Sequence, residues 1–97
     1  MKKVYFMKEI TPENLVKLYD VLGVKLKGNV AVKVHSGEEG NQNFLKPEFM
    51  KEIIDHVGGR VVECNTAYPG ERTNNKNHYK LLEKHGWSNY YDFDLMD

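Results

Sequence analysis

The chain has 97 residues, of which 40% are hydrophobic and 29% are charged, and its 14 basic residues balance 14 acidic ones. A chain of this size forms one small domain, and the composition is typical of a folded globular protein, not of a disordered or collagen-like one. The neutral balance provides no overall field that would attract nucleic acid or an anionic membrane surface. We therefore expect a single domain, residues 1–97, that binds neither of them.

The N-terminus and the cysteine content indicate the cellular setting. Lys2 and Lys3 are followed by only four apolar residues before charge returns. Such a run is too short for a signal-peptide core or a membrane span, so we expect a cytoplasmic location. The single cysteine, Cys64, excludes an internal disulfide and any four-thiolate iron–sulfur or zinc site within this chain. Any iron–sulfur cluster would have to come from another chain.

Three stretches have the hydrophobic spacing of amphipathic helices. The first begins at Pro12, directly after the N-cap Thr11, and ends before Gly23. The other two follow the same rules of capping and termination: one from Pro47 to Gly58-Gly59, and one from a cap at Thr73 or an adjacent Asn to Gly86.

Strand-like segments alternate with these helices. Residues 30–35 alternate Val with Ala, Lys and His, which is typical of a β-strand with one apolar face. Further strands are expected at residues 4–7, 60–65 and 90–96. Because helices separate the strands, right-handed crossovers and a mainly parallel sheet follow. We expect an α/β fold in the order β-α-β-α-β-α-β, a three-layer, Rossmann-like half domain with a sheet of three to four strands.

Polar side chains gather where the predicted strands end. In open parallel sheets, ligands bind beyond the carboxyl ends of the strands, toward which helix N-termini also point their amides. The loops at residues 8–10, 35–46 and 65–72 should meet at this edge. We expect ligand-binding residues there: Lys33, His35, Glu38, Asn43, Asn65, Thr66, Tyr68 and Arg72.

The chemistry of these residues favours a small anionic ligand or cofactor. Lys33 and Arg72 would supply positive charge, and Asn43, Asn65 and Tyr68 would orient the ligand. No glycine-rich phosphate-binding motif is present. The structural alternative is that these loops are polar because they face water and that their glycines only form turns.

A metal site is a further interpretation of the same edge. His35 with Glu38 would be its ligands, joined by Glu39 or Glu63, because imidazole and carboxylates suit zinc, iron or manganese. The chain has no HExxH or CxxC spacing. Strand alternation places Cys64 opposite Glu63, as a small core residue and not a nucleophile.

The third predicted helix carries two histidines on its apolar stripe. His78 and His85 lie seven residues apart on this stripe. We expect both of them to be packed and hydrogen-bonded, and not to serve as metal ligands.

Several separated motifs resemble one family. They are Val32-Lys-Val-His-Ser-Gly-Glu-Glu-Gly-Asn41, Phe44-Leu-Lys-Pro47, Glu63-Cys-Asn-Thr-Ala-Tyr-Pro-Gly-Glu-Arg72, His78 and His85-Gly86. In this order they resemble the family known as domain of unknown function 362. The resemblance covers most of the chain and implies the N-terminal part of a longer family domain. Members are often fused to ferredoxin-type modules that bind [4Fe-4S] clusters, which implies a redox setting and a ferredoxin-type module as a partner.

The resemblance names no reaction, so three functional classes stay open. The favoured one is ligand binding in a redox context. The second is an enzyme half-site in which His35 and Glu38 perform acid–base or metal-assisted chemistry once a partner completes it. The third is an interaction module that dimerises, because half of a sheet leaves an edge that a second copy or a partner domain would cover.

Overall fold

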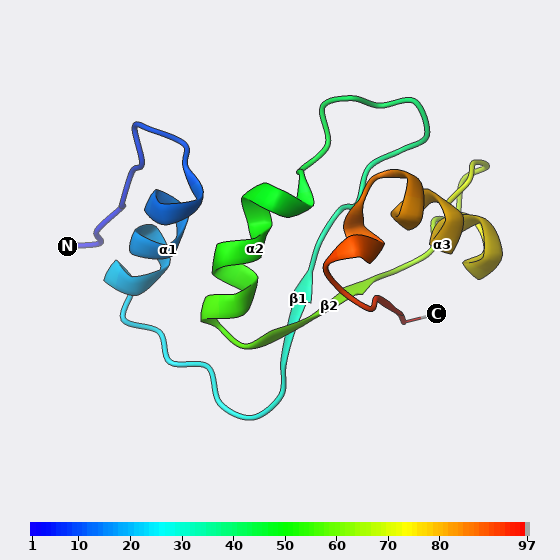
Figure 1. Cartoon of the computed structure of the whole chain (residues 1–97). Helices are drawn as coiled ribbons and strands as arrows, with labels where there is room; N and C mark the ends of the chain where they lie inside the picture. Colours follow the sequence, from blue (N-terminus) through cyan, green and yellow to red (C-terminus); the bar gives the residue numbers. More distant parts are fainter. Residues whose placement is uncertain (97) are drawn as a thin grey trace.

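The computed structural model describes residues 1–96, in which three helices accompany a three-stranded parallel sheet (Figure 1). The helices are α1 (Pro12–Val21), α2 (Pro47–His56) and α3 (Asn75–Lys84), and a 3-10 turn follows at Trp87–Asn89. The strands are β1 (Val30–Lys33), β2 (Gly59–Glu63) and β3 (Asp94–Leu95), in the spatial order β1-β2-β3. The expected α/β class is confirmed. In the described part of the chain, no helix combines the length and the apolar character needed to cross a membrane.

The helices begin where the sequence places their caps. The hydroxyl of Thr11 accepts a hydrogen bond from the backbone N–H of Asn14 at 3.1 Å, and the side-chain oxygen of Asn74 accepts one from the N–H of Asn77 at 3.0 Å. These bonds satisfy N–H groups that have no partner within their helices. The first and third helices therefore start at the predicted residues.

The strand register decides which side chains share a face of the sheet. Val32 pairs with Val61 and Lys33 pairs with Val62 along β1 and β2. Since paired residues of parallel strands point to the same side, Glu63 belongs to the face of Val61, and not to the face of Lys33. This placement governs the geometry of the candidate site.

The core lies on the Val61 face, where α2 and α3 cover the sheet. It contains apolar side chains from β2, β3, the two helices, the residue after β1 and the segment after α3: Val34, Ile54, Val61, Leu82, Trp87, Phe93 and Leu95. The rings of Trp87 and Phe93 meet edge to face at 5.4 Å, a favoured aromatic geometry.

The layering differs from the expected three layers. On the opposite face of the sheet, Val62 is buried, and the side chains around it are exposed: Ala31, Lys33, Arg60 and Asp94. α1 packs beside α2 and farther from the sheet (Figure 1). Among the described elements, the helices that cover the sheet thus lie on one face.

Two strand predictions need correction. The strand expected at residues 4–7 is wrong: this segment is not paired in the sheet, and it runs along α1 with Val4 and Phe6 exposed. The strand expected at residues 90–96 is reduced to β3, because the backbone N–H groups of Tyr90 and Tyr91 bond back to the carbonyl of Trp87. A four-residue apolar run does not specify a strand unless a neighbouring strand pairs with it.

Candidate functional site

A buried arginine lies at the centre of the candidate site. Arg72 follows β2 in a loop that is closed by a bond from the Thr66 N–H to the Arg72 carbonyl at 2.8 Å. Its side chain is only 4% exposed. Nη2 donates to Glu63, while Nη1 donates to Oε1 of Glu38 at 2.5 Å and lies 3.0 Å from Nε2 of His35. We call the group around it the Arg72 cluster: His35, Glu38, Glu63, Asn65, Tyr68, Arg72 and His78.

The inner side of the Arg72 cluster is fully buried. Glu63 and His78 are both 0% exposed, with Nε2 of His78 3.1 Å from Oε2 of Glu63. The other ring nitrogen of His78 lies 2.9 Å from the side-chain oxygen of Asn65, whose amide nitrogen donates to Asn75 at 2.7 Å. A buried carboxylate is tolerated when charges and hydrogen bonds compensate it. Glu63 therefore fixes the inner amino group of Arg72.

The outer side of the cluster faces solvent. Glu38 is 35% exposed, and Oε1 accepts a hydrogen bond from the phenol of Tyr68 at 2.5 Å in addition to that from Arg72. The bond from Tyr68, together with the hydrogen bond and the charge of Arg72, holds the pKa of Glu38 below its ordinary value against the opposing effect of burial. The same carboxylate raises the pKa of Tyr68. Glu38 is therefore a stably ionised partner of Arg72.

His35 is less completely satisfied than its neighbours. Nδ1 accepts from the N–H of Gly37 at 3.2 Å, and Nε2 faces the N–H of Arg72 Nη1. A neutral imidazole offers one acceptor and one donor, so only one of these two contacts is a good hydrogen bond at any moment. In addition, Nε of Arg72 is buried and has no hydrogen-bond partner among residues 1–96. The cluster thus has unused capacity to bind an acceptor.

Two predicted residues lie outside the Arg72 cluster. Lys33 is exposed at the end of β1, and its ammonium donates to the carbonyl of Val34 at 3.0 Å. Asn43 is exposed on the loop before α2, where its N–H donates to the side chain of Asn41 at 2.9 Å. Thr66 borders the cluster, since its hydroxyl donates to the carbonyl of Tyr68 at 3.2 Å.

The buried half of the cluster is not among the ligand-binding residues expected from the sequence. Glu63 entered only as one of several metal ligands, and His78 only as a packed, hydrogen-bonded histidine, which it is. His85 is also packed and hydrogen-bonded, because Nδ1 contacts the Ser36 carbonyl at 2.9 Å and the ring stacks on Phe44. The sequence contains one indication of this buried half. Glu63 directly follows Val61 and Val62, and a carboxylate at such a core position requires partners.

The cluster forms by a different route from the expected one. We expected Lys33 and His35 at the same polar edge as Glu63, the possible metal ligand, but Glu63 is on the opposite face of the sheet from Lys33. Arg72 joins the two faces, because one of its amino groups contacts Glu63 and the other contacts His35. The loop after β2 therefore brings together residues that strand alternation separates.

Arg72 already contacts both of the predicted metal ligands, His35 and Glu38. Nη1 of Arg72 contacts both His35 and Glu38. Across residues 1–96, no group of three or more His, Cys, Asp or Glu side chains is placed to hold a metal ion. Metal binding by His35 and Glu38 stays a prediction, and it would require the guanidinium to move away.

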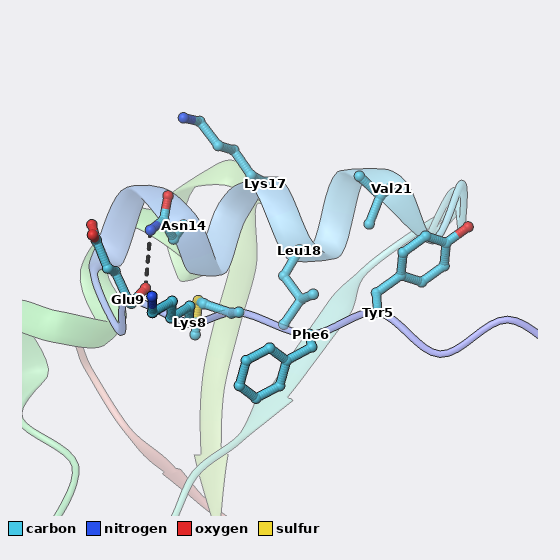
Figure 2. Close-up of a pocket in the computed structure, with 9 residues that line it drawn as sticks. Tyr5, Phe6, Lys8, Glu9, Asn14, Lys17, Leu18 and Val21 are labelled. Atoms are coloured by element: carbon cyan, nitrogen blue, oxygen red, sulfur yellow. Dashed lines mark hydrogen bonds between the residues drawn. The ribbon is translucent and has the colours of Figure 1, made fainter.

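Two surface hollows lie away from Arg72. One groove of about 410 Å³ runs between the N-terminal segment and α1, and Figure 2 shows Phe6, Leu18 and Val21 lining it. A second hollow of about 410 Å³ lies between the loop before α2 and the end of α3, lined by residues that include Phe44 and His85. Neither hollow is lined by Arg72. A ligand that reaches Arg72 must therefore displace part of its cover.

Comparisons with known proteins give no relative. No protein-family model matches the chain, and neither the curated proteins nor the solved structures contain a match.

Proposed function

We propose that this protein binds a small anionic ligand or cofactor at the C-terminal edge of the sheet, with Arg72 as the anion-binding group. The observation that carries this proposal is the asymmetry of the guanidinium. Nη2 is held by the buried Glu63, whereas Nη1 points toward the solvent-facing side chains of Glu38 and His35. Arginine binds carboxylates and phosphates through such paired N–H groups.

The inner contacts make the arginine suitable for binding. Burial disfavours the charged form of Arg72, but Glu63 and Glu38 outweigh it and raise the pKa of the guanidinium, so Arg72 stays charged. Glu63 and His78 fix its position before any ligand arrives. A preorganised donor loses little conformational freedom on binding, which favours affinity. Lys33, held at the end of β1 by its bond to Val34, adds a second positive charge near this edge.

The setting of the proposed function comes from the sequence. The resemblance to domain of unknown function 362 supports a redox context with a ferredoxin-type module as a partner. Within that setting, we propose a cytoplasmic location.

The test is a titration of the isotope-labelled protein with sodium acetate and, separately, with inorganic phosphate at constant ionic strength, followed by amide NMR. We expect saturable shifts at residues 36–41 and 66–72 with at least one anion. Arg72→Lys keeps the buried charge but loses the paired donors, so it should weaken binding about ten-fold. The matched control is Arg60→Lys, because Arg60 is exposed on the far face of the sheet.

Lys33→Ala provides a second comparison. Because the Lys33 side chain is exposed, this variant should fold normally and bind the anion more weakly. If neither anion produces saturable shifts in the wild-type protein, the proposal is wrong.

A second candidate function is an interaction module that dimerises. Phe6, which lines a groove together with Leu18 and Val21 (Figure 2), is 86% exposed, and Val4 in the same segment is 93% exposed. Contiguous apolar surface on a small protein commonly marks an interface, and we propose a second copy of this chain as its occupant. Light scattering across a concentration series tests this: a dimer that Phe6→Glu dissociates supports it, and a monomer at every concentration removes it.

A further inference from the structure

We infer that the carboxylate of Glu38 occupies the anion site when no ligand is bound. It accepts hydrogen bonds from Arg72 and Tyr68 in the position of a ligand carboxylate, and it is displaced when that ligand binds. This inference rests on the proposed function and adds the chemical class of the ligand and the group that it must displace. Four features of the structure support it: the cover over Arg72, the donors that converge on Glu38, the charge balance, and the freedom of the turn.

Of the two carboxylates that cover Arg72, Glu38 is the more readily displaced. The guanidinium is 4% exposed, and its inner amino group is closed by Glu63, which is fully buried. The outer amino group is covered by Glu38, which is 35% exposed. Displacing Glu63 would leave a buried carboxylate without its cation, which is costly. Displacing Glu38 returns its carboxylate to water.

The donors around Glu38 form a binding position for a carboxylate oxygen. The phenol of Tyr68 and Nη1 of Arg72 both donate to the same atom, Oε1 of Glu38, at 2.5 Å. Convergent donors of which one is charged are typical of carboxylate recognition. Because Nε of Arg72 is buried without a partner among residues 1–96, the guanidinium also has donor capacity that Glu38 and Glu63 leave unused.

The local charge favours a monocarboxylate over phosphate. Arg72 carries one positive charge, and Glu63 already supplies one buried negative charge. A ligand with a single negative charge that replaces Glu38 leaves the balance of the cluster unchanged. A doubly charged phosphate would add negative charge close to Glu63, and like charges at short range repel.

The turn that carries Glu38 has a fixed base and a free end. At the base, a Cβ atom on Gly37 would lie 2.6 Å from Cβ of Phe44, so this residue is tightly packed. At the free end, Gly40 has open space around it, and the Asn41 N–H closes the turn on the Glu38 carbonyl at 3.1 Å. Because the Glu38 side chain is already 35% exposed, it can rotate into solvent while Gly37 keeps the loop in place.

The experiment compares Glu38→Gln with Glu39→Gln. Sodium acetate is the probe for a monocarboxylate ligand, and inorganic phosphate, titrated separately, is the probe for the alternative ligand class. Both variants lose one negative charge from the same turn, but Glu39 bonds to the exposed Lys84 and not to Arg72. The amide spectrum of each variant first establishes that it is folded. We expect acetate to bind Glu38→Gln about ten-fold more tightly than the wild type or Glu39→Gln, because the internal competitor is lost.

Each other outcome overturns a defined statement. Equal acetate affinity in all three proteins overturns the role of Glu38 as an occupant, and the proposed function stands. Weaker binding by Glu38→Gln also overturns it, because Glu38 then contributes to the site. A larger gain for phosphate than for acetate overturns the carboxylate class. Saturable binding of neither anion by any of the three proteins overturns the proposed function itself and this inference with it.

Discussion

Nε2 of His78 lies 3.1 Å from Oε2 of Glu63, and neither side chain is exposed to solvent. The second oxygen of the same carboxylate accepts from Arg72, so two side chains from different segments compensate one buried charge. A charge in the core of a domain this small persists only when it is paired and hydrogen-bonded. The Arg72 cluster is therefore part of the folded core as well as a candidate binding site.

Replacing His78 should destabilise the protein strongly. His78→Leu removes one partner of Glu63 and leaves the side-chain oxygen of Asn65 without the imidazole. We expect the free energy of unfolding to fall by about 3 kcal/mol, measured by urea denaturation. The control is His56→Leu, because His56 is exposed and pairs with Asp20 on the surface; it should cost less than about 1 kcal/mol. Equal losses in the two variants would contradict the role of His78.

Arg72 and Glu63 should be strongly coupled in a double-mutant cycle. Arg72→Met leaves a buried carboxylate with His78 alone, and Glu63→Met leaves a buried cation with Glu38 alone. Each single change should cost about 3–5 kcal/mol of unfolding free energy, and the double variant should cost at least about 2 kcal/mol less than their sum. Additive losses, measured by denaturation, would show that the two side chains act independently.

The titration of Glu38 should report its two donors. The bond from Tyr68 and then the charge of Arg72 lower its pKa from the ordinary value of 4.5. Because the folded-state pKa is the lower one, ionised Glu38 contributes stability above about pH 4.5, and this contribution is lost as the pH falls through the folded-state pKa. Carboxyl-detected NMR should therefore show a midpoint below 4.5 in the wild type.

Tyr68→Phe isolates the contribution of the phenol, which is the largest of these effects. The midpoint of Glu38 should move upward in this variant, because burial then opposes the remaining Arg72 contact alone. Tyr79→Phe is the control, because the Tyr79 hydroxyl donates to the carbonyl of Phe93, away from Glu38. An unchanged midpoint in Tyr68→Phe would mean that the phenol does not bind the carboxylate in solution.

The sequence predicts the helices of this fold better than its strands. The caps at Thr11 and Asn74 are local, since each side chain bonds an N–H three residues away, and local hydrogen bonds can be recognised from spacing alone. A strand depends on a distant partner. Residues 4–7 have the composition of a strand, yet they lie along α1 and not beside β1 or β3 (Figure 2).

The candidate site could be predicted in part of its membership but not in its geometry. Strand-end position correctly brought His35, Glu38, Tyr68 and Arg72 to one edge. The role of Glu63 depended on the register of β1 with β2, which places it on the core face. Alternation within one strand fixes relative faces only, and the register between strands is set by the packing of the whole domain.

Two glycines of the Glu38 loop should respond differently to the same substitution. Gly37 has φ 101° and Gly40 has φ 78°, so alanine is strained at either position. At Gly37 the new Cβ would also lie 2.6 Å from Cβ of Phe44, whereas at Gly40 it would meet open space. We expect Gly40→Ala to cost about 1–2 kcal/mol of unfolding free energy and Gly37→Ala to cost about 1–3 kcal/mol more, because packing is disturbed as well. Urea denaturation of both variants measures the difference. Similar losses in the two proteins would mean that the base of the turn relaxes freely, and Gly37 would then not anchor the loop that carries Glu38.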